Sequence, residues 1–247
     1  MTYRTLDVTE ASDRVVVRLD RPAERNAISR EMVDELHAVC GRLEKEPRAL
    51  LLTGGDQGVF AGGADIAELR ERGRLDALDG INLRLFERIR ALPMPTVAAI
   101  DGYALGGGAE LAYACDLRIA SDRAVFGQPE PQLGILPGAG ATWRLVRLLG
   151  ESVAKQILLA GRRLDAEEAL RCGLVIDVVP ADGLLAAADA LLDRVLRSSA
   201  LALRLTKMAV DAPEGAHPSF ELAAQAVLFE DEEKRERMTA FLERRAK

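Results

Sequence analysis

The sequence predicts an α/β fold that ends in an all-helical C-terminal third. Short aliphatic and β-branched runs alternate with helical patterns up to residue 179, and no such run follows. Strands that alternate with helices are typical of an α/β core. The chain has 247 residues, of which 49% are apolar, so it is long enough for one large domain or for a domain with an appendage.

Five runs have the character of β-strands. They are short and are dominated by Val, Ile, Leu and Ala. The runs are VVVRL (15–19), ALLLTG (49–54), TVAAIDG (96–102), LRIA (117–120) and LVIDVV (174–179). We expect these segments to form the sheet of the core.

Helical spacing marks the segments between these strands. Apolar side chains recur three and four positions apart over residues 29–45, and residues 81–91 show the same spacing. Asp165 is expected to cap a short helix, with Glu168 completing a capping-box pattern and Gly173 ending the helix.

The pattern changes at Leu184, after which we expect only helices, over 184–195, 200–210 and 219–245. We therefore divide the chain into a core, residues 1–183, and a C-terminal helical region, residues 184–247. The apolar stripes of this region predict that it packs against another copy of the chain, which would make the protein a homo-oligomer.

Charge and composition narrow the class of protein. A formal net charge of −6 with a pI near 5.2 argues against nucleic-acid binding, although an anionic small ligand needs only a local basic patch. No apolar run approaches the roughly 20 residues of a membrane helix, and the first ten residues lack a signal-peptide pattern. Three cysteines without CxxC spacing favour reduced thiols in a cytoplasmic protein.

Histidine chemistry is equally limited. His37 and His217 are the only two histidines, and they lie in a helical pattern and a turn, respectively. A His-rich metal site and a Ser-His-Asp triad are therefore not expected. Catalysis in this chain would depend on carboxylates and backbone groups.

The stretch GYALGGGAELAYACD (102–116) places three consecutive glycines at a strand-to-helix junction. Backbone N–H groups at a helix start are free, and glycine lets a ligand approach them closely. Glu110 follows within the first turn. A second stretch, VFAGGADIAEL (59–69), repeats the design, with a helix starting near Ala64 and Asp65 in its first turn. Two such junctions can aim two N–H donors at one oxygen, which is an oxyanion hole.

A third glycine-rich stretch, FGQPEPQLGILPGAG (126–140), holds a second acid. Glu130 lies between two prolines, and we expect the apolar side chains Phe126, Leu133, Ile135 and Leu136 to surround it. A carboxyl group so placed would have a raised pKa and serve as a general acid. Glu110 and Glu130 would also suit a two-carboxylate glycosidase, but sugar sites use aromatic platforms and this chain is only 4% aromatic.

These three stretches resemble the signature stretches of the enoyl-CoA hydratase/isomerase, or crotonase, family. RPAERNAI (21–28) is similar to the first CoA-side loop of that family, and FEDEEKRERMTAFLERR (229–245) to its C-terminal helix. The resemblance implies a crotonase-like spiral of ββα units followed by an all-helical oligomerisation region that builds a trimer or a dimer of trimers. It implies an acyl-CoA thioester as substrate, with no cofactor beyond the coenzyme A that the substrate carries.

The resemblance also implies roles for individual residues. The N–H groups of Ala64 and Gly107 would hold the thioester oxygen as an enolate forms. Hydratases of the family carry two glutamates, here Glu110 and Glu130, which together add water across the C2=C3 bond. By analogy Glu130 protonates C2 and Glu110 holds the water, although the sequence alone leaves the order open.

Coenzyme A contacts follow from the same matching of motifs. Arg25 is placed to reach a CoA phosphate, and residues at the C-terminus would approach the nucleotide from a neighbouring subunit. The full set of expected contacts is Arg25, Ala27, Gly62, Ala64, Asp65, Ile66, Gly107, Pro129, Gly138, Phe241, Arg244 and Lys247.

The chain departs from the family pattern after the Glu130 loop. Ala141 stands where a third small glycine is frequent and Trp143 where glutamine is common, so the acyl pocket is expected to differ. Within the family, a Δ3,Δ2-enoyl-CoA isomerase, or a hydratase for a branched acyl-CoA or for one from an aromatic pathway, is the alternative. A non-catalytic RNA- or partner-binding subunit is a further one, against which the net charge and the intact acid pair argue.

Overall fold

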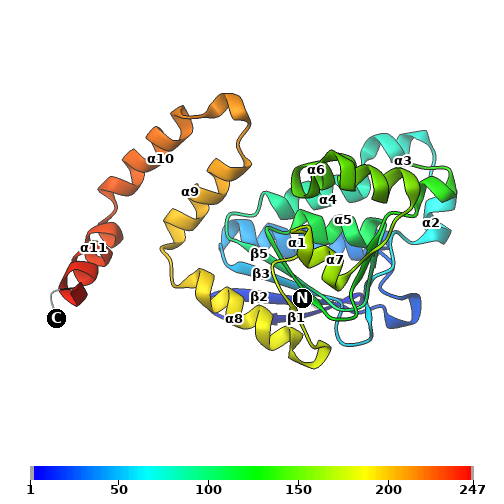
Figure 1. The fold of residues 1–247 in the computed structure, drawn as a ribbon, viewed down its shortest axis with the longest axis horizontal. Coiled ribbons are helices and arrows are strands. Elements are labelled where there is room, and N and C mark those ends of the chain that lie inside the picture. Colours follow the sequence, from blue (N-terminus) through cyan, green and yellow to red (C-terminus); the bar gives the residue numbers. More distant parts are fainter. Residues whose placement is uncertain (1–2, 246–247) are drawn as a thin grey trace.

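The computed structural model describes residues 3–245 and contains two β-sheets, flanking helices and a helical C-terminal extension (Figure 1). The larger sheet has the strand order β1-β2-β3-β5-β7-β10, and the smaller has the order β4-β6-β8-β9. The strands are β1 (Leu6–Glu10), β2 (Arg14–Leu19), β3 (Ala49–Thr53), β4 (Val59–Ala61), β5 (Thr96–Ile100), β6 (Tyr103–Leu105), β7 (Leu117–Ser121), β8 (Val125–Gly127), β9 (Leu164–Asp165) and β10 (Val178–Val179).

A repeated ββα unit adds one strand to each of the two sheets. In each unit the first strand joins the large sheet, the second joins the small sheet, and one or more helices follow. The units are β3–β4 with α2 (Ile66–Glu71), α3 (Arg74–Asp79) and α4 (Ile81–Arg90), then β5–β6 with α5 (Gly107–Ala114), then β7–β8 with α6 (Ala141–Ala160). Equivalent strands of successive units pair in parallel. The expected spiral of ββα units is confirmed.

The strand predictions need two corrections. The strand predicted over 96–102 ends at Ile100, because the chain turns at Gly102 (φ +64), where an added Cβ would lie 1.7 Å from Gly58 O. β5 ends before this turn and β6 starts after it, in the other sheet. The segment 174–179 forms a strand only at β10, since Leu174 and Val175 are buried in the turn that follows a helix. Strands β1, β6, β8 and β9 were not predicted from the sequence.

The predicted helix starts are largely confirmed. Ser29 caps α1 (Arg30–Lys45) by accepting from Met32 N at 3.3 Å. Asp165 and Glu168 form the expected capping box of α7 (Ala166–Arg171), with Glu168 N donating to Asp165 Oδ1 at 2.8 Å. The capping box of α7 lies next to the helix it starts, which is why the sequence predicted it, whereas the Ser29 cap was not predicted.

Successive side chains of the central strands point to opposite faces of the large sheet, so the core has two layers. Leu50 and Leu52 of β3 pack into the main cluster with α1, α4 and α5, whereas Leu51 faces a second cluster with α8 (Leu184–Leu196). Both faces of the large sheet are therefore covered. By packing, α8 belongs to the core, and the division of the chain after residue 183 stays a prediction.

The C-terminal helices α9 (Ala200–Asp211), α10 (Ser219–Glu230) and α11 (Glu232–Arg245) extend away from the sheets and contain no buried residue (Figure 1). The single helix predicted over 219–245 is in fact two, because Asp231 adopts an extended conformation. Two ion pairs attach α9 to the core: Lys207 Nζ lies 2.6 Å from Asp116 Oδ2, and Arg90 Nη2 lies 2.6 Å from Asp211 Oδ1. Over residues 3–245, none of the helices has both the length and the apolar character needed to span a membrane.

Candidate active site

Two strand–glycine–helix junctions meet at Ala64 and Gly107. A Cβ built on Gly107 would lie 3.3 Å from Ala64 N, and one built on Gly63 would lie 4.0 Å from Gly107 N. Within the described residues, neither the Ala64 N–H nor the Gly107 N–H donates a hydrogen bond. Two free N–H groups therefore lie close together, beside a space that a side chain at Gly107 would fill.

Backbone contacts hold these two junctions against each other. Ile28 N donates to Gly63 O at 2.8 Å, and Asp65 N donates to Ile28 O at 3.1 Å, so the chain on each side of Ala64 is fixed. On the other junction, a Cβ at Gly108 would lie 2.2 Å from Ala61 O. Only glycine allows α5 to approach β4 this closely, and this approach positions Gly107 beside Ala64.

Glu110 lies one turn into α5 and is only 3% exposed. Its Oε1 accepts hydrogen bonds from Ala139 N at 2.8 Å and from Ala141 N at 3.0 Å. Burial raises the pKa of Glu110, while these backbone donors and the nearby charge of Arg144 oppose the rise. The carboxylate is thus stabilised by the free N–H groups at the start of α6.

Arg144, which was not predicted from the sequence, fixes the loop that precedes α6. Arg144 is buried, and it donates to Ala139 O at 3.1 Å and to Glu87 Oε1 at 2.6 Å. These bonds hold the loop before α6 so that its N–H groups face Glu110. The run PGAGAT before a helix was the available signal, because it marks a helix start rich in exposed backbone.

Glu130 begins a short 3-10 turn, Glu130–Leu133, and is 9% exposed. Its Oε1 lies only 2.7 Å from where a Cβ of Gly106 (φ +52) would stand. Burial raises the pKa of Glu130 to about 7, and the negative charge of Glu110 adds to the rise. The Gln128 side-chain amide, oriented to donate, lies 2.9 Å from Glu130 Oε2.

The predicted surroundings of Glu130 are only partly correct. Phe126 is fully buried, but Leu133, Ile135 and Leu136 are exposed. The Glu130 carboxyl group packs against the glycine junction at Gly106, and the Gln128 side-chain amide faces it. The pKa of Glu130 is raised by burial, as expected, although three of the four predicted apolar neighbours are exposed.

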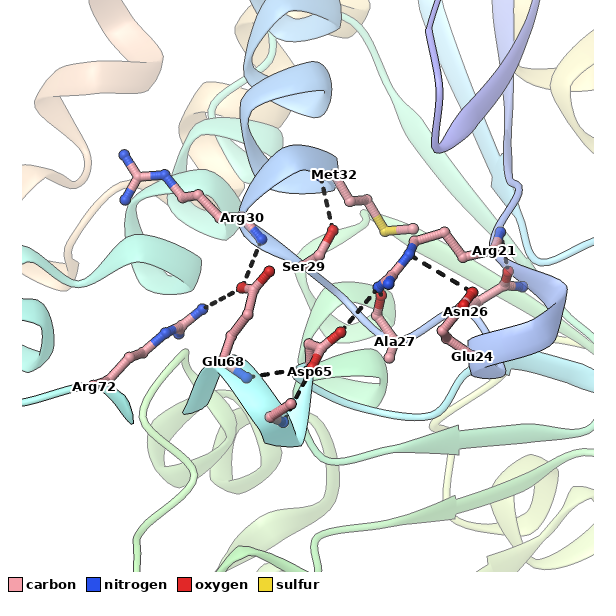
Figure 2. Close-up of polar contacts among 11 residues, drawn as sticks. Arg21, Glu24, Asn26, Ala27, Ser29, Arg30, Met32, Asp65, Glu68 and Arg72 are labelled. Carbon is pink, nitrogen blue, oxygen red and sulfur yellow. Dashed lines mark hydrogen bonds and ion pairs between the residues drawn. The ribbon is translucent and has the colours of Figure 1, made fainter. Parts of the chain in front are cut away.

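The expected coenzyme A loops lie side by side (Figure 2). Gly62 N donates to Arg25 O at 2.9 Å, which joins the 21–28 loop to the second glycine junction. Arg21 Nη1 donates to Ala27 O at 2.7 Å and to Asp65 Oδ2 at 3.3 Å. Asp65 also caps α2 through Ala67 N and Glu68 N, which leaves Ile66 exposed at the helix start.

Other predicted contacts are placed differently. Pro129 precedes Glu130 directly, and Gly138 is exposed in the loop that leads to Ala139. Phe241 and Arg244 lie on α11, at the opposite end of the molecule from α2 (Figure 1). Within one chain they are not brought to the site. Lys247 lies outside the described residues. Residues 3–245 contain no group of three or more His, Cys, Asp or Glu side chains arranged to hold a metal ion.

Comparison with known proteins identifies the relatives of this chain. The model of the family described as enoyl-CoA hydratase/isomerase matches residues 10–247. The chain belongs to the enoyl-CoA hydratase/isomerase family. It is 41% identical to a probable enoyl-CoA hydratase of Mycobacterium bovis, over 100% of this chain and 98% of that protein. It is 37% identical to a crotonyl-CoA hydratase of Syntrophomonas wolfei, over 99% and 97% of the two chains.

Solved structures of the enoyl-CoA hydratase/isomerase family have the same fold. The enoyl-CoA hydratase of Bacillus anthracis superimposes with a TM-score of 0.92 at 33% identity, covering 98% of this chain and 97% of that one. The crotonase-like fold expected from the sequence is therefore confirmed over nearly the whole chain. Within this family fold, the two free N–H groups and the two buried glutamates form the candidate active site.

Proposed function

We propose that the protein is an enoyl-CoA hydratase, a hydro-lyase that adds water across the C2=C3 bond of a 2-enoyl-CoA to give a 3-hydroxyacyl-CoA. One observation carries the proposal: two buried glutamates with raised pKa values flank a pair of free backbone N–H groups. Relatives with 37–41% identity over nearly their whole length are described as enoyl-CoA hydratases, and one of them as a crotonyl-CoA hydratase.

The geometry suggests how the atoms move. The thioester oxygen accepts from the N–H groups of Ala64 and Gly107, which draws electrons away from C3. Glu110, ionised, holds a water and takes its proton as the water oxygen bonds to C3. The electron pair of the double bond passes to C2 and the thioester, forming an enolate whose oxygen the two N–H groups stabilise.

Glu130 completes the addition. With a pKa of about 7, it is protonated in a large share of molecules at neutral pH and donates a proton to C2. The cycle ends with Glu110 protonated and Glu130 ionised, and one proton exchanged between them through water restores the site. No cofactor is required in this scheme, because both protons come from the water and the glutamates.

Coenzyme A lies along the joined loops in this proposal. The Arg25 guanidinium is exposed and, in the described chain, makes no ion pair or hydrogen bond, so its charge is free for a phosphate. Phe241 and Arg244 would complete the nucleotide site from the α11 helix of another subunit, since their own α11 lies far from their own site.

We also propose that the protein is a homo-oligomer, a trimer or a dimer of trimers, built through α9–α11. These helices expose large apolar side chains that the core of one chain does not cover. The set is Met208, Val210, Leu222, Val227, Phe229, Met238, Phe241 and Leu242. A cytoplasmic location, supported by three free cysteines, completes the proposal.

A Δ3,Δ2-enoyl-CoA isomerase is the alternative within the family. That reaction moves one proton from C2 to C4 and needs one acid–base group, whereas addition of water uses two. The burial and mutual influence of Glu110 and Glu130 favour hydration.

The test is an absorbance assay of the enoyl-thioester band with crotonyl-CoA and longer 2-enoyl-CoA homologues. We expect the band to disappear as the 3-hydroxyacyl-CoA forms, also in enzyme dialysed against a chelator. A matched assay with a 3-enoyl-CoA, in which the band appears instead, measures isomerisation. Loss of hydration in Glu130→Gln by about 10²-fold or more ties the activity to the site. Faster turnover of the 3-enoyl-CoA, or no turnover of any 2-enoyl-CoA, would overturn the proposal.

A further inference from the structure

The space beside Gly107 is bounded by a third nitrogen that belongs to a side chain. A Cβ built on Gly107 would lie 3.5 Å from Asn82 Nδ2, almost as close as the 3.3 Å to Ala64 N. Gly107 N itself lies about 2.5 Å from that point by standard bond geometry. Three nitrogens thus surround one small volume that the glycine leaves free.

Asn82 lies in the first turn of α4 and is half-buried. Its Oδ1 is fully buried and has no hydrogen-bond partner within residues 3–245. An amide oxygen that is buried without a hydrogen-bond partner destabilises the folded protein. A buried polar atom without a partner calls for an explanation, and a functional role is one of the established ones.

The only other asparagine of the chain shows the contrast. Asn26 is also buried, but its Nδ2 lies 3.1–3.2 Å from three carbonyl oxygens, and its Oδ1 accepts from Arg21 N at 2.9 Å. Asn26 is a fully bonded structural amide that holds its loop. Asn82 makes none of these bonds, so the fold does not explain it.

We propose that Asn82 is a third hydrogen-bond donor to the thioester oxygen, acting with the N–H groups of Ala64 and Gly107. This inference rests on the proposed function. The side chain lies where the substrate oxygen gains negative charge, and a fixed amide N–H there stabilises the enolate more than the ground state. Leucine at this position would leave no buried oxygen without a partner. Asparagine therefore lowers the stability of the fold, and its contribution to the reaction rate explains why it is present.

The experiment compares wild type with Asn82→Leu, which is similar in size and has no donor. We expect kcat for crotonyl-CoA to fall on the order of tenfold, with KM changed by less than about threefold. The melting temperature is expected to stay the same or rise, because the orphaned acceptor is gone. Asn82→Asp should lose more activity than Asn82→Leu, since a carboxylate would face the developing negative charge. Asn82→Ala replaces Asn82→Leu if the larger side chain prevents folding.

A spectroscopic measurement reports the same contact without turnover. A conjugated cinnamoyl thioester of coenzyme A absorbs at longer wavelength when donors polarise its carbonyl group, and we expect a smaller red shift in Asn82→Leu than in wild type. Arg84→Ala, on the exposed side of the same helical turn, is the matched control and should keep both rate and shift. For the stability readout, Asn26→Leu should lower the melting temperature.

The outcomes separate this inference from the proposed function. Wild-type rate and red shift in Asn82→Leu would overturn the role of Asn82 while the hydratase assignment stands. A lower melting temperature together with an unchanged red shift would also overturn it, by showing a structural role. A wild-type protein that binds the thioester without any red shift would overturn the oxyanion site itself.

Discussion

At the scale of single residues, the two glutamates differ in what surrounds them. One oxygen of Glu110 is held by two backbone N–H groups, which favour its ionised form. Glu130 is faced by the side-chain amide of Gln128, and burial raises the pKa of its carboxyl group to about 7. Two carboxyl groups with different environments can divide the work of acid and base between them.

The raised pKa of Glu130 predicts how activity depends on pH. The protonated form donates to C2, so kcat/KM for crotonyl-CoA is expected to fall as the pH rises through about 7. At low pH the rate should fall again as Glu110 becomes protonated. A rate profile from pH 5 to 9 checks this. A rate that keeps rising above pH 8 would contradict Glu130 as the proton donor.

The same pKa predicts a stability effect. Between pH 4.5, the ordinary value, and about 7, the folded state keeps a proton on Glu130 that the unfolded state has lost. Stability linked to this group is therefore present at low pH and falls as the pH rises, by on the order of 3 kcal/mol across the window. Glu130→Gln should remove this dependence. Chemical denaturation of both proteins at pH 5 and pH 8 measures it, and parallel changes in both would contradict it.

At the scale of elements, helix α5 carries both a backbone N–H group and a glutamate of the candidate active site. The helix starts at Gly107, so one free N–H faces the site, and Glu110 follows one turn later on the same helix. All eight residues of α5 are buried, and the helix is therefore fixed by packing before substrate arrives.

Gly107→Pro tests this arrangement, because proline removes the N–H and is tolerated at the first position of a helix. We expect the hydration rate to fall about 10²–10³-fold. Circular dichroism and thermal melting must show a folded protein, since the added ring enters a tight space beside Ala64 N. A folded variant with a near-normal rate would rule out the oxyanion role of Gly107.

At the scale of the whole molecule, the extension formed by α9–α11 determines the predicted assembly. Leu222 and Val227 of α10 are 72% and 54% exposed in one chain, which is unfavourable for apolar side chains unless another subunit covers them. Light scattering should give a mass that is a multiple of 26.7 kDa, with three or six subunits.

A paired substitution, Leu222→Asp with Val227→Asp, should shift this mass toward the monomer. Leu159→Asp is the control, because Leu159 is 77% exposed but lies on α6, outside the C-terminal extension. A clean monomer of the wild type at micromolar concentration would contradict the proposed assembly, as would an unchanged mass of the α10 variant.

The sequence by itself determined the local features of this protein. The cap at Asp165, the glycine junctions before α2 and α5, and the change to helices at residue 184 depend on residues close together in the chain. Such features follow from backbone conformations and hydrogen bonds within a few positions, so a single sequence predicts them.

Only the tertiary structure decided the features that join distant segments. It showed that Ala139 and Ala141 hold Glu110, that Gly106 and Gln128 enclose Glu130, and that Asn82 faces Gly107. It also ended the strand predicted over 96–102 at Ile100 and placed Phe241 and Arg244 away from the site of their own chain. Burial, and with it the pKa of a carboxyl group, depends on which parts of the chain come together in space, and no local pattern records that.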